Sequence, residues 1–297
     1  MTNRHVRIQE QRFRGQKLGI AIGLLALAGL GLPLQGSDSP ESKVVKQLRA
    51  IYAEDAAEYS IYRDVERREK LELRQEPVYA WTNPVLGQEG AMFVWTRQGR
   101  PEAIGSIFSF PAQVKGMRGL MHEFHSVSTA TLVPERASLN RWEPQSGLVM
   151  KALPDAPKPA DSARPRLLQL RDLSRSFTAR SVDPDGRTCE LRLLTQPLHR
   201  YQSTDPDIID GALFAFVSSA GTDPEVVVMI EARRGDDEPV WKYAPCRFSN
   251  LNLHVKYNDA EVWTSILGGE NTKEHDAQHL YHLHRDRRID DVKSDTN

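Results

Sequence analysis

Apolar and polar positions follow two different patterns along this chain, and both are typical of β-strands. Residues 251–257 alternate strictly, because Leu, Leu, Val and Tyr at every second position are separated by Asn, His and Lys. Such a strand has one face toward a core and one toward water, as in an antiparallel sheet. Residues 91–95 and 226–230 are instead apolar at every position, which predicts central strands covered on both faces.

Two further segments have the period of an amphipathic helix. Ser39-Pro40-Glu41 is a helix start, with Ser as N-cap, Pro at the first helical position and an acid in the first turn. Apolar residues then recur at helical spacing to about Arg68, and Pro165 begins a second such segment that runs to Phe177. The expected strands are 71–81, 90–96, 102–110 and 121–133 after the first helix, and 188–201, 211–218, 225–233, 241–257 and 261–267 after the second.

Residues 70–142 recur, diverged, at residues 189–263. Glu-Gly-Ala-Met-Phe at 89–93 faces Asp-Gly-Ala-Leu-Phe at 210–214, and Gly-Arg-Pro-Glu at 99–102 faces Gly-Thr-Asp-Pro-Glu at 221–225. Two unrelated hairpins with similar turns are the alternative. The register holds over the whole span, which favours an internal duplication.

A helix followed by an antiparallel meander, twice, predicts an α+β protein of two tandem repeats, each a cystatin-like or nuclear-transport-factor-2-like cone. The alternative is one pseudo-symmetric β-sandwich. The expected organisation is a signal peptide or membrane anchor at 1–36, repeat one at 37–150, a Pro-rich connector at 151–165, repeat two at 166–269, and a charged His-containing tail at 270–297.

The N-terminal segment has the composition of an export signal. Five basic residues and one acid precede an uncharged apolar run at 18–34. A signal peptide cleaved after Ala28 or Gly36 and an uncleaved transmembrane helix both fit this run, whereas a buried core helix would have a polar face. In either case the segment contacts the membrane, and we expect the body to be extracytoplasmic: secreted, periplasmic or anchored.

Charge and cysteine content narrow the class of protein. The net charge of −1 argues against a dedicated nucleic-acid surface. The two cysteines, Cys189 and Cys246, could pair in an oxidising compartment. The sequence does not show that they approach bonding distance, and we favour two separate buried thiols.

His122-Glu123-Phe124-His125 is the first candidate for chemistry. In a strand, Glu123 and His125 share a face and His122 points the other way. A carboxylate that orients an imidazole is a workable acid–base pair. The matching positions of the second copy hold Tyr243, Ala244 and Cys246, so the pair is specific to the first.

Other candidates are weaker. His275, His279 and His282 would share one face if the tail is helical, and could then bind Zn²⁺ or Ni²⁺. Trp241 has no counterpart in the first copy and is a ligand-contact candidate, whereas the other tryptophans match aromatics and favour a core role. Pro-Glu at 101–102 and 224–225 could mark a carboxylate site, but turn chemistry explains these residues as well.

Four runs carry a family resemblance: Trp-Thr-Asn-Pro at 81–84, Gly-Arg-Pro-Glu-Ala at 99–103, and the segments 210–216 and 221–225. Together they resemble a family of uncharacterised secreted or membrane-anchored bacterial proteins, over roughly residues 45–265. The resemblance implies an extracytoplasmic soluble body and brings no activity, cofactor or catalytic residue.

The sequence therefore predicts a non-catalytic extracytoplasmic binding or structural module whose partner is a protein, a peptide or a glycan. The alternative is an extracytoplasmic hydrolase that uses Glu123 and His125. No cofactor is expected, since the Gly19–Gly23 pattern lies inside the apolar run rather than between a strand and a helix.

Overall fold

A computed structural model describes residues 43–136, 142–145, 147–266 and 280–291. The chain divides into two units, residues 1–40 and 41–297, and every described residue belongs to the second. The apolar run at 18–34 lies outside the described residues. No helix among those that are described is long and apolar enough to cross a membrane, so the transmembrane helix predicted from the sequence has no support in the structure.

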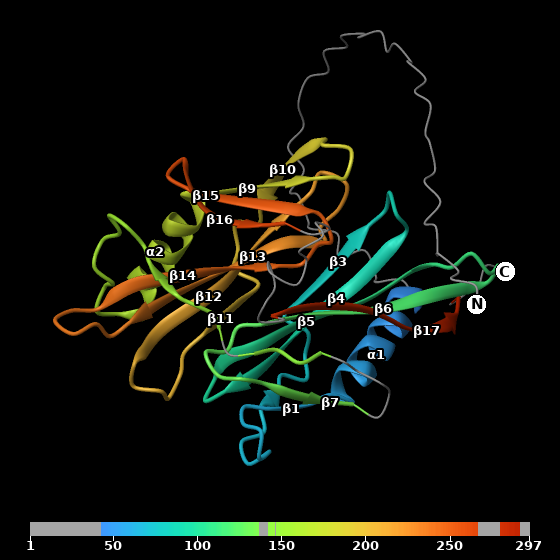
Figure 1. Cartoon of the computed structure of the whole chain (residues 1–297), viewed down its shortest axis with the longest axis horizontal. Coiled ribbons are helices and arrows are strands. Elements are labelled where there is room, and N and C mark those ends of the chain that lie inside the picture. Colours follow the sequence, from blue (N-terminus) through green and yellow to red (C-terminus); the bar gives the residue numbers. More distant parts are fainter. Residues whose placement is uncertain (1–42, 137–141, 146, 267–279, 292–297) are drawn as a thin grey trace, which may run out of the picture. The chain divides into compact units, whose positions relative to one another are not determined.

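The first curled antiparallel sheet has six strands in the order β17-β6-β5-β4-β2, with β3 also paired to β4 (Figure 1). Its helix packs on β4 and β5. The elements of this half are α1 (Lys43–Ala57), β1 (Ser60–Tyr62), β2 (Glu72–Leu73), β3 (Tyr79–Asn83), β4 (Gln88–Arg97), β5 (Arg100–Pro111), β6 (Met117–Ser126), β7 (Val133–Glu135) and, from the end of the chain, β17 (Tyr281–Asp290). Strands β1 and β7 form a separate pair.

The second sheet has nine strands in the order β16-β15-β9-β10-β12-β13-β14-β8, with β11 paired to β12. Its helix contacts β9, β12 and β13. The elements of this half are β8 (Lys151–Ala152), α2 (Ala163–Arg175), β9 (Phe177–Val182), β10 (Thr188–Leu193), β11 (His199–Tyr201), β12 (Ile208–Val217), β13 (Pro224–Arg233), β14 (Val240–Arg247), β15 (Asn252–Tyr257) and β16 (Ala260–Ser265).

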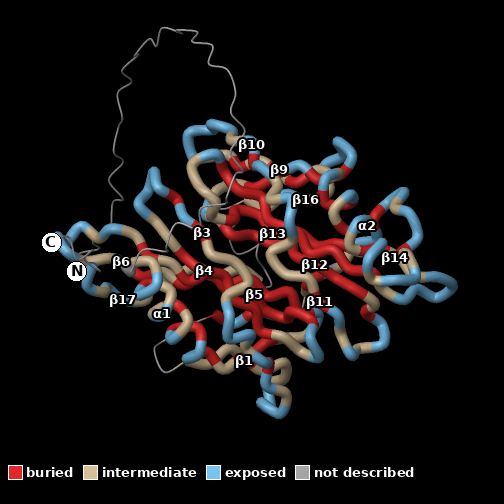
Figure 2. Tube along the Cα trace, turned by 180° about the vertical axis from the view of Figure 1, so that it is seen from behind, coloured by how far each residue is buried: buried red, intermediate tan, exposed pale blue. Residues whose placement is uncertain are grey.

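The strands that are apolar at every position bury both faces, as their pattern predicts. In β4, Phe93 and Trp95 pack toward α1, whereas Met92 and Val94 face the second sheet. Burying one such side chain contributes about 1.5–3 kcal/mol to folding. Figure 2 shows the buried residues running through β4, β5, β12 and β13. The two sheets therefore share one core cluster, and each also has its own cluster against a helix.

The α+β class predicted from the sequence is wrong. Strands hold 49% of the structure and helices only 12%, and the architecture is two curled antiparallel sheets, each a half-barrel. Neither cystatin-like or nuclear-transport-factor-2-like helix-plus-meander repeats nor a single pseudo-symmetric sandwich describes it. The helices are too short to form a layer that balances sheets of six and nine strands.

The first helix ends at Ala57, well before the Arg68 expected from the spacing of apolar residues. The chain enters β1 at Ser60 instead, and after that strand the Asp64 carboxylate accepts hydrogen bonds from the backbone N–H groups of Arg68 and Glu69. Such local side-chain bonds offer the backbone an alternative to the helix. Arg67 takes a φ of 58°, which closes this turn.

A glycine paired with an aromatic residue of the neighbouring strand occurs in both sheets. Trp81 of β3 pairs with Gly90 of β4, and Tyr201 of β11 pairs with Gly211 of β12. A Cβ on Gly90 would lie 2.6 Å from the Trp81 ring, and one on Gly211 would lie 2.4 Å from the Tyr201 ring. Glycine is therefore required where each aromatic ring lies flat on the strand. The internal duplication itself stays a prediction.

Candidate functional site

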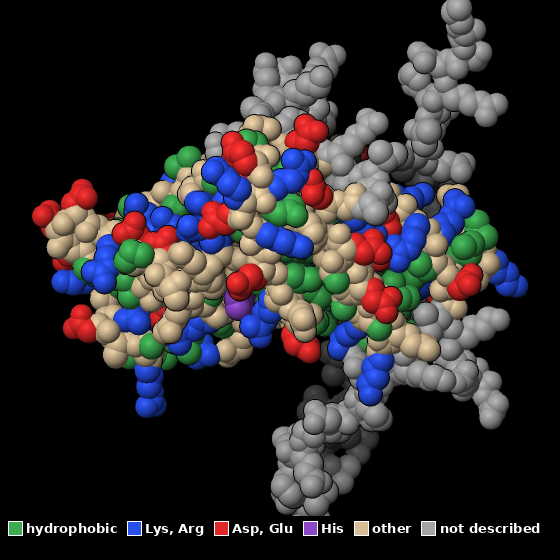
Figure 3. Space-filling model, turned by 90° about the horizontal axis from the view of Figure 1, so that it is seen from below, with side chains coloured by type: hydrophobic (Ala, Val, Ile, Leu, Met, Phe, Trp, Pro, Cys, Tyr) green, Lys and Arg blue, Asp and Glu red, His purple; other side chains and the backbone are tan. Residues whose placement is uncertain are grey.

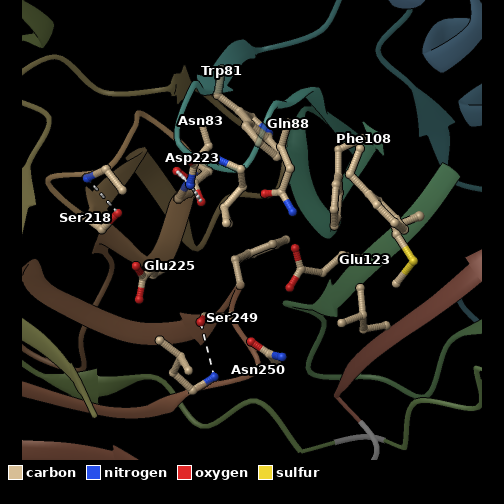
Figure 4. Close-up of a pocket in the computed structure, with 18 of the residues that line it drawn as sticks. Trp81, Asn83, Gln88, Phe108, Glu123, Ser218, Asp223, Glu225, Ser249 and Asn250 are labelled. Carbon is tan, nitrogen blue, oxygen red and sulfur yellow. Dashed lines mark hydrogen bonds between the residues drawn. The ribbon is translucent and has the colours of Figure 1, made fainter. Parts of the chain in front are cut away.

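A pocket of about 530 Å³ lies where the two sheets meet (Figure 4). The first sheet contributes the β3–β4 turn and residues of β5, β6 and β17, and the second contributes the β12–β13 turn and the β14–β15 loop. Its polar lining includes three carboxylates, those of Glu123, Asp223 and Glu225. The volume lies in the range of small-molecule sites.

Glu123 enters the pocket from β6 and is only 6% exposed. The alternation of the strand sends it there and sends His122 toward α1, as the sequence predicts. The hydroxyl of Tyr281 in β17 donates a hydrogen bond of 2.7 Å to its Oε1 atom. Burial raises the pKa of Glu123 to about 7, the Tyr281 hydrogen bond and Arg247 oppose the shift, and Asp223 and Glu225 add to it. Near neutral pH a carboxyl with this pKa is present in both its protonated and its ionised form.

Of the two acids of the second sheet, Asp223 lies in the β12–β13 turn and Glu225 lies at the start of β13. Asn83 Nδ2 donates to both carboxylate oxygens of Asp223 at 3.2 Å, and the Thr222 N–H donates to Thr82 O at 2.8 Å. A Cβ at Gly221 would lie 2.5 Å from Thr82 O, so glycine permits this close approach. The turn is thereby held against β3, and Asp223 faces the first sheet.

Glu225 is buried without a matching charge. Burial raises its pKa, while the hydroxyls of Ser181 and Ser218 oppose the shift. Its Oε2 atom has no hydrogen-bond partner among the described residues. A buried acceptor left unsatisfied costs about 1–3 kcal/mol, so Glu225 is stabilised by any donor that enters the pocket.

The apolar part of the wall includes four aromatic rings. The other polar side chains of the lining are those of Asn83, Gln88, Ser218, Ser249, Asn250 and Arg285. Trp81 lies over Gly90, donates from Nε1 to Ser106 Oγ at 3.2 Å, and meets Phe108 with ring centroids 5.3 Å apart. Phe248 contributes from the second sheet. Val85 is 75% exposed in the β3–β4 turn, so apolar surface continues outward from the pocket.

Arg247 holds the β14–β15 loop in place. Its guanidinium donates to the carbonyl oxygens of Ser249, Leu251 and Ser265. It also lies over the Tyr281 ring, 5.7 Å from the centroid. One buried cation therefore fixes the loop that lines the pocket and the strand that carries the hydroxyl bound to Glu123.

His125 shares a face with Glu123 but is not part of the pocket lining. Its Nδ1 donates to Ser126 O at 2.8 Å, and its ring packs against Phe248 with centroids 6.3 Å apart. Burial lowers its pKa to about 4, with Arg247 adding to the shift and the Ser126 bond opposing it. Among the described contacts Glu123 bonds to Tyr281 instead, so the structure does not bring the predicted acid–base pair together.

His122 belongs to a separate buried cluster under α1. Its Nδ1 accepts from the Tyr59 hydroxyl at 2.7 Å, and its Nε2 donates to Asp55 at 3.0 Å. The ligand atoms of His122, His284 and Asp286 lie within 4.8 Å of one another, a spacing that suits a metal ion. Both nitrogens of His122 are already bonded, however, and arginines neutralise the two aspartates: Arg136 and Arg287 bond to Asp286, and Arg287 bonds to Asp55. We interpret the cluster as a charge-balanced structural network.

The other candidates from the sequence lie away from the pocket. His275 and His279 lie outside the described residues. His282 lies on β17, a strand paired to β6, so this part of the expected tail does not have the helical spacing required for the proposed face. Trp241 is 2% exposed in the core between α2 and the second sheet, where a ligand does not reach it. Cys189 and Cys246 are both free thiols, in different core clusters.

Sequence reasoning assigned the acids of the β12–β13 turn to turn chemistry. A signal was present in the aligned copies, because Glu225 faces Glu102. Glu102 accepts a hydrogen bond of 2.9 Å from Arg100, whereas the second copy has Thr-Asp in place of that arginine. Glu225 therefore lacks the arginine that Glu102 has, and a buried acid with a raised pKa in a pocket is a candidate functional residue.

Comparisons with protein-family models, curated proteins and solved structures find no match to this chain. The resemblance to secreted or membrane-anchored bacterial proteins therefore stays a prediction.

Proposed function

We propose that this chain is a non-catalytic extracytoplasmic binding module that holds a small amphipathic ligand in the pocket between its two sheets. The observation that carries the proposal is a cavity whose lining combines aromatic rings with three carboxylates. Concave, mostly apolar sites with a few placed polar groups are typical of ligand pockets. If the ligand is a peptide or a glycan, one of its side chains or one of its sugar units would occupy the pocket.

The exposed surface fits this proposal better than a nucleic-acid partner. On the face shown in Figure 3, basic and acidic side chains are interspersed rather than separated by sign. An extracytoplasmic location rests on the basic and apolar composition of residues 1–36.

The test is a screen of small amphipathic molecules by thermal shift, followed by titration of the hits. Ligands that bind in the pocket raise the melting temperature and change the NMR resonances of Trp81 and Phe108. Trp81→Phe weakens binding severalfold, whereas Trp241→Phe, a matched change in the other core, leaves affinity unchanged. Equal effects of the two substitutions would place the ligand elsewhere.

A hydrolase that uses Glu123 is the second candidate. A pKa of about 7 in a pocket suits a general acid or base. Purified protein would be screened on esters, glycosides and peptides, with Glu123→Gln as the control. If wild type is active and Glu123→Gln is inactive, the hydrolase is supported. If Glu123→Gln keeps the activity, Glu123 is not the catalytic residue.

A further inference from the structure

The charges around the pocket are unequal. Three carboxylates line it, against a single basic side chain among the described lining residues, that of Arg285. Arg247 bonds to the carbonyls of its loop, and Arg285 is an exposed residue that lies over the Phe110 ring, 5.4 Å from the centroid. Among the described lining residues acidic side chains therefore outnumber basic ones, and Arg247, outside the lining, only partly offsets the raised pKa of Glu123.

We propose that the ligand is an organic cation, an amine or a guanidine, whose charged group binds the carboxylates of Glu123 and Glu225. This rests on the proposed function and names the class of ligand. The cation would supply the donor that Glu225 Oε2 lacks among the described residues. A charged donor also forms the stronger type of hydrogen bond with a carboxylate.

The aromatic wall favours an organic cation over a metal ion. Trp81, Phe108 and Phe248 offer π faces, which attract ammonium and guanidinium groups. A calcium ion takes six to eight oxygen ligands, and apolar rings supply none of them. The apolar surface instead suits the hydrocarbon part of an amine.

Binding of a cation should release a proton. Glu123 has a pKa of about 7, raised mainly by burial. The charged and titratable groups around it are Tyr281 and Arg285 of β17, Arg247 of β14, His125 of β6 itself, and Asp223 and Glu225 of the opposite sheet. A cation beside this carboxyl stabilises its charged form, so the pKa falls and a proton leaves on binding.

The experiment compares two series with the same carbon skeletons by calorimetry on the full chain. One holds phenethylamine, hexylamine and phenethylguanidine, and the other holds 2-phenylethanol and hexanol. We expect the cations to bind at least tenfold more tightly than the alcohols. Titrations at pH 7 in phosphate and in Tris should differ in heat, since the released proton is taken up by the buffer.

Two variants test which carboxylates bind the charged group of the amine. Glu123→Gln and Glu225→Gln each reduce amine affinity at least tenfold and leave alcohol affinity unchanged, and Glu123→Gln also abolishes the proton release. Glu190→Gln, at an exposed position of β10, is the control and changes neither. Circular dichroism verifies that each variant is folded.

The outcomes separate this inference from the proposed function. If alcohols bind as tightly as amines, the inference of a cationic ligand is wrong, but the proposal of a binding module is unaffected. A different result would be that amines do not bind, whereas calcium binds and both Gln variants abolish its binding. This result would show a metal site instead of an organic-cation site. If no member of either series binds, both the inference and the small-ligand proposal fail.

Discussion

At the scale of the residue, Glu123 links ligand binding to stability. Its pKa in the folded protein, about 7, is above the ordinary value of 4.5, so the folded state binds more protons between these two pH values. Unfolding free energy therefore falls as pH rises through this window. Glu123→Gln keeps an acceptor for Tyr281 and removes the ionisation. We predict that the variant matches wild type below about pH 4.5 and is more stable at pH 8 by up to about 3 kcal/mol. Urea unfolding at both pH values measures this, and an equal stability at pH 8 would contradict it.

Ionisation of His125 changes stability with pH in the opposite direction to that of Glu123. Burial lowers its pKa to about 4, below the ordinary value of 6.5, and His199 and His284 shift in the same direction, also mainly through burial. The unfolded state therefore binds more protons between these values, and unfolding free energy falls as pH drops from about 6.5 to 4.

We predict that His125→Gln makes this acid destabilisation shallower by up to about 3 kcal/mol, the contribution of one imidazole. The measurement is the slope of unfolding free energy against pH. A slope identical to that of wild type would show that His125 takes up its proton without unfolding.

At the scale of the element, the two glycines under aromatic rings provide a matched pair. Gly90→Ala forces a Cβ into Trp81, which lines the pocket, and Gly211→Ala forces one into Tyr201, which does not. Overpacking costs about 1–3 kcal/mol, so both variants should lose comparable stability. We predict that only Gly90→Ala also weakens ligand binding. Thermal melts and titrations measure the two effects, and weakened binding in both variants would mean that the pocket responds to the sheet as a whole.

The individual strands indicate how much of the fold can be predicted from the sequence. The strands β4, β5 and β13 lie within two residues of the expected 90–96, 102–110 and 225–233, because continuous apolar runs between turns require burial on both faces. The expected strand at 241–257 is divided instead into β14 and β15, because residues 248–251 bend into the pocket lining. The sequence predicts a charged tail where β17 lies, because most of its residues are charged or histidine and no apolar alternation marks it as a strand; it pairs with β6. For the same reason the sequence identified Glu123 but not Tyr281 of β17, which donates a hydrogen bond to it.

At the scale of the whole molecule, Arg100 of β5 connects the two sheets. Its Nε donates to Glu231 of β13 at 2.8 Å, and the Tyr201 hydroxyl donates to the same oxygen at 2.7 Å. Although burial opposes it, Arg100 and Arg233 hold the pKa of Glu231 below its ordinary value. The pair therefore stays ionised inside the shared core, and neither charge can reach water if the other is removed.

We predict that Arg100→Met costs about 3–5 kcal/mol of unfolding free energy, because it leaves a buried carboxylate without its main cation. Adding Glu231→Gln removes that uncompensated charge, so the double variant should recover part of the loss rather than add to it. Arg187→Met is the control: its partner Asp183 belongs to an exposed turn, and such pairs contribute at most about 1 kcal/mol. Urea unfolding of wild type, Arg100→Met, Glu231→Gln and the double variant gives the coupling energy. If the two core substitutions are instead additive, the sheets are held together by their apolar contacts alone, and the buried pair has no role in joining them.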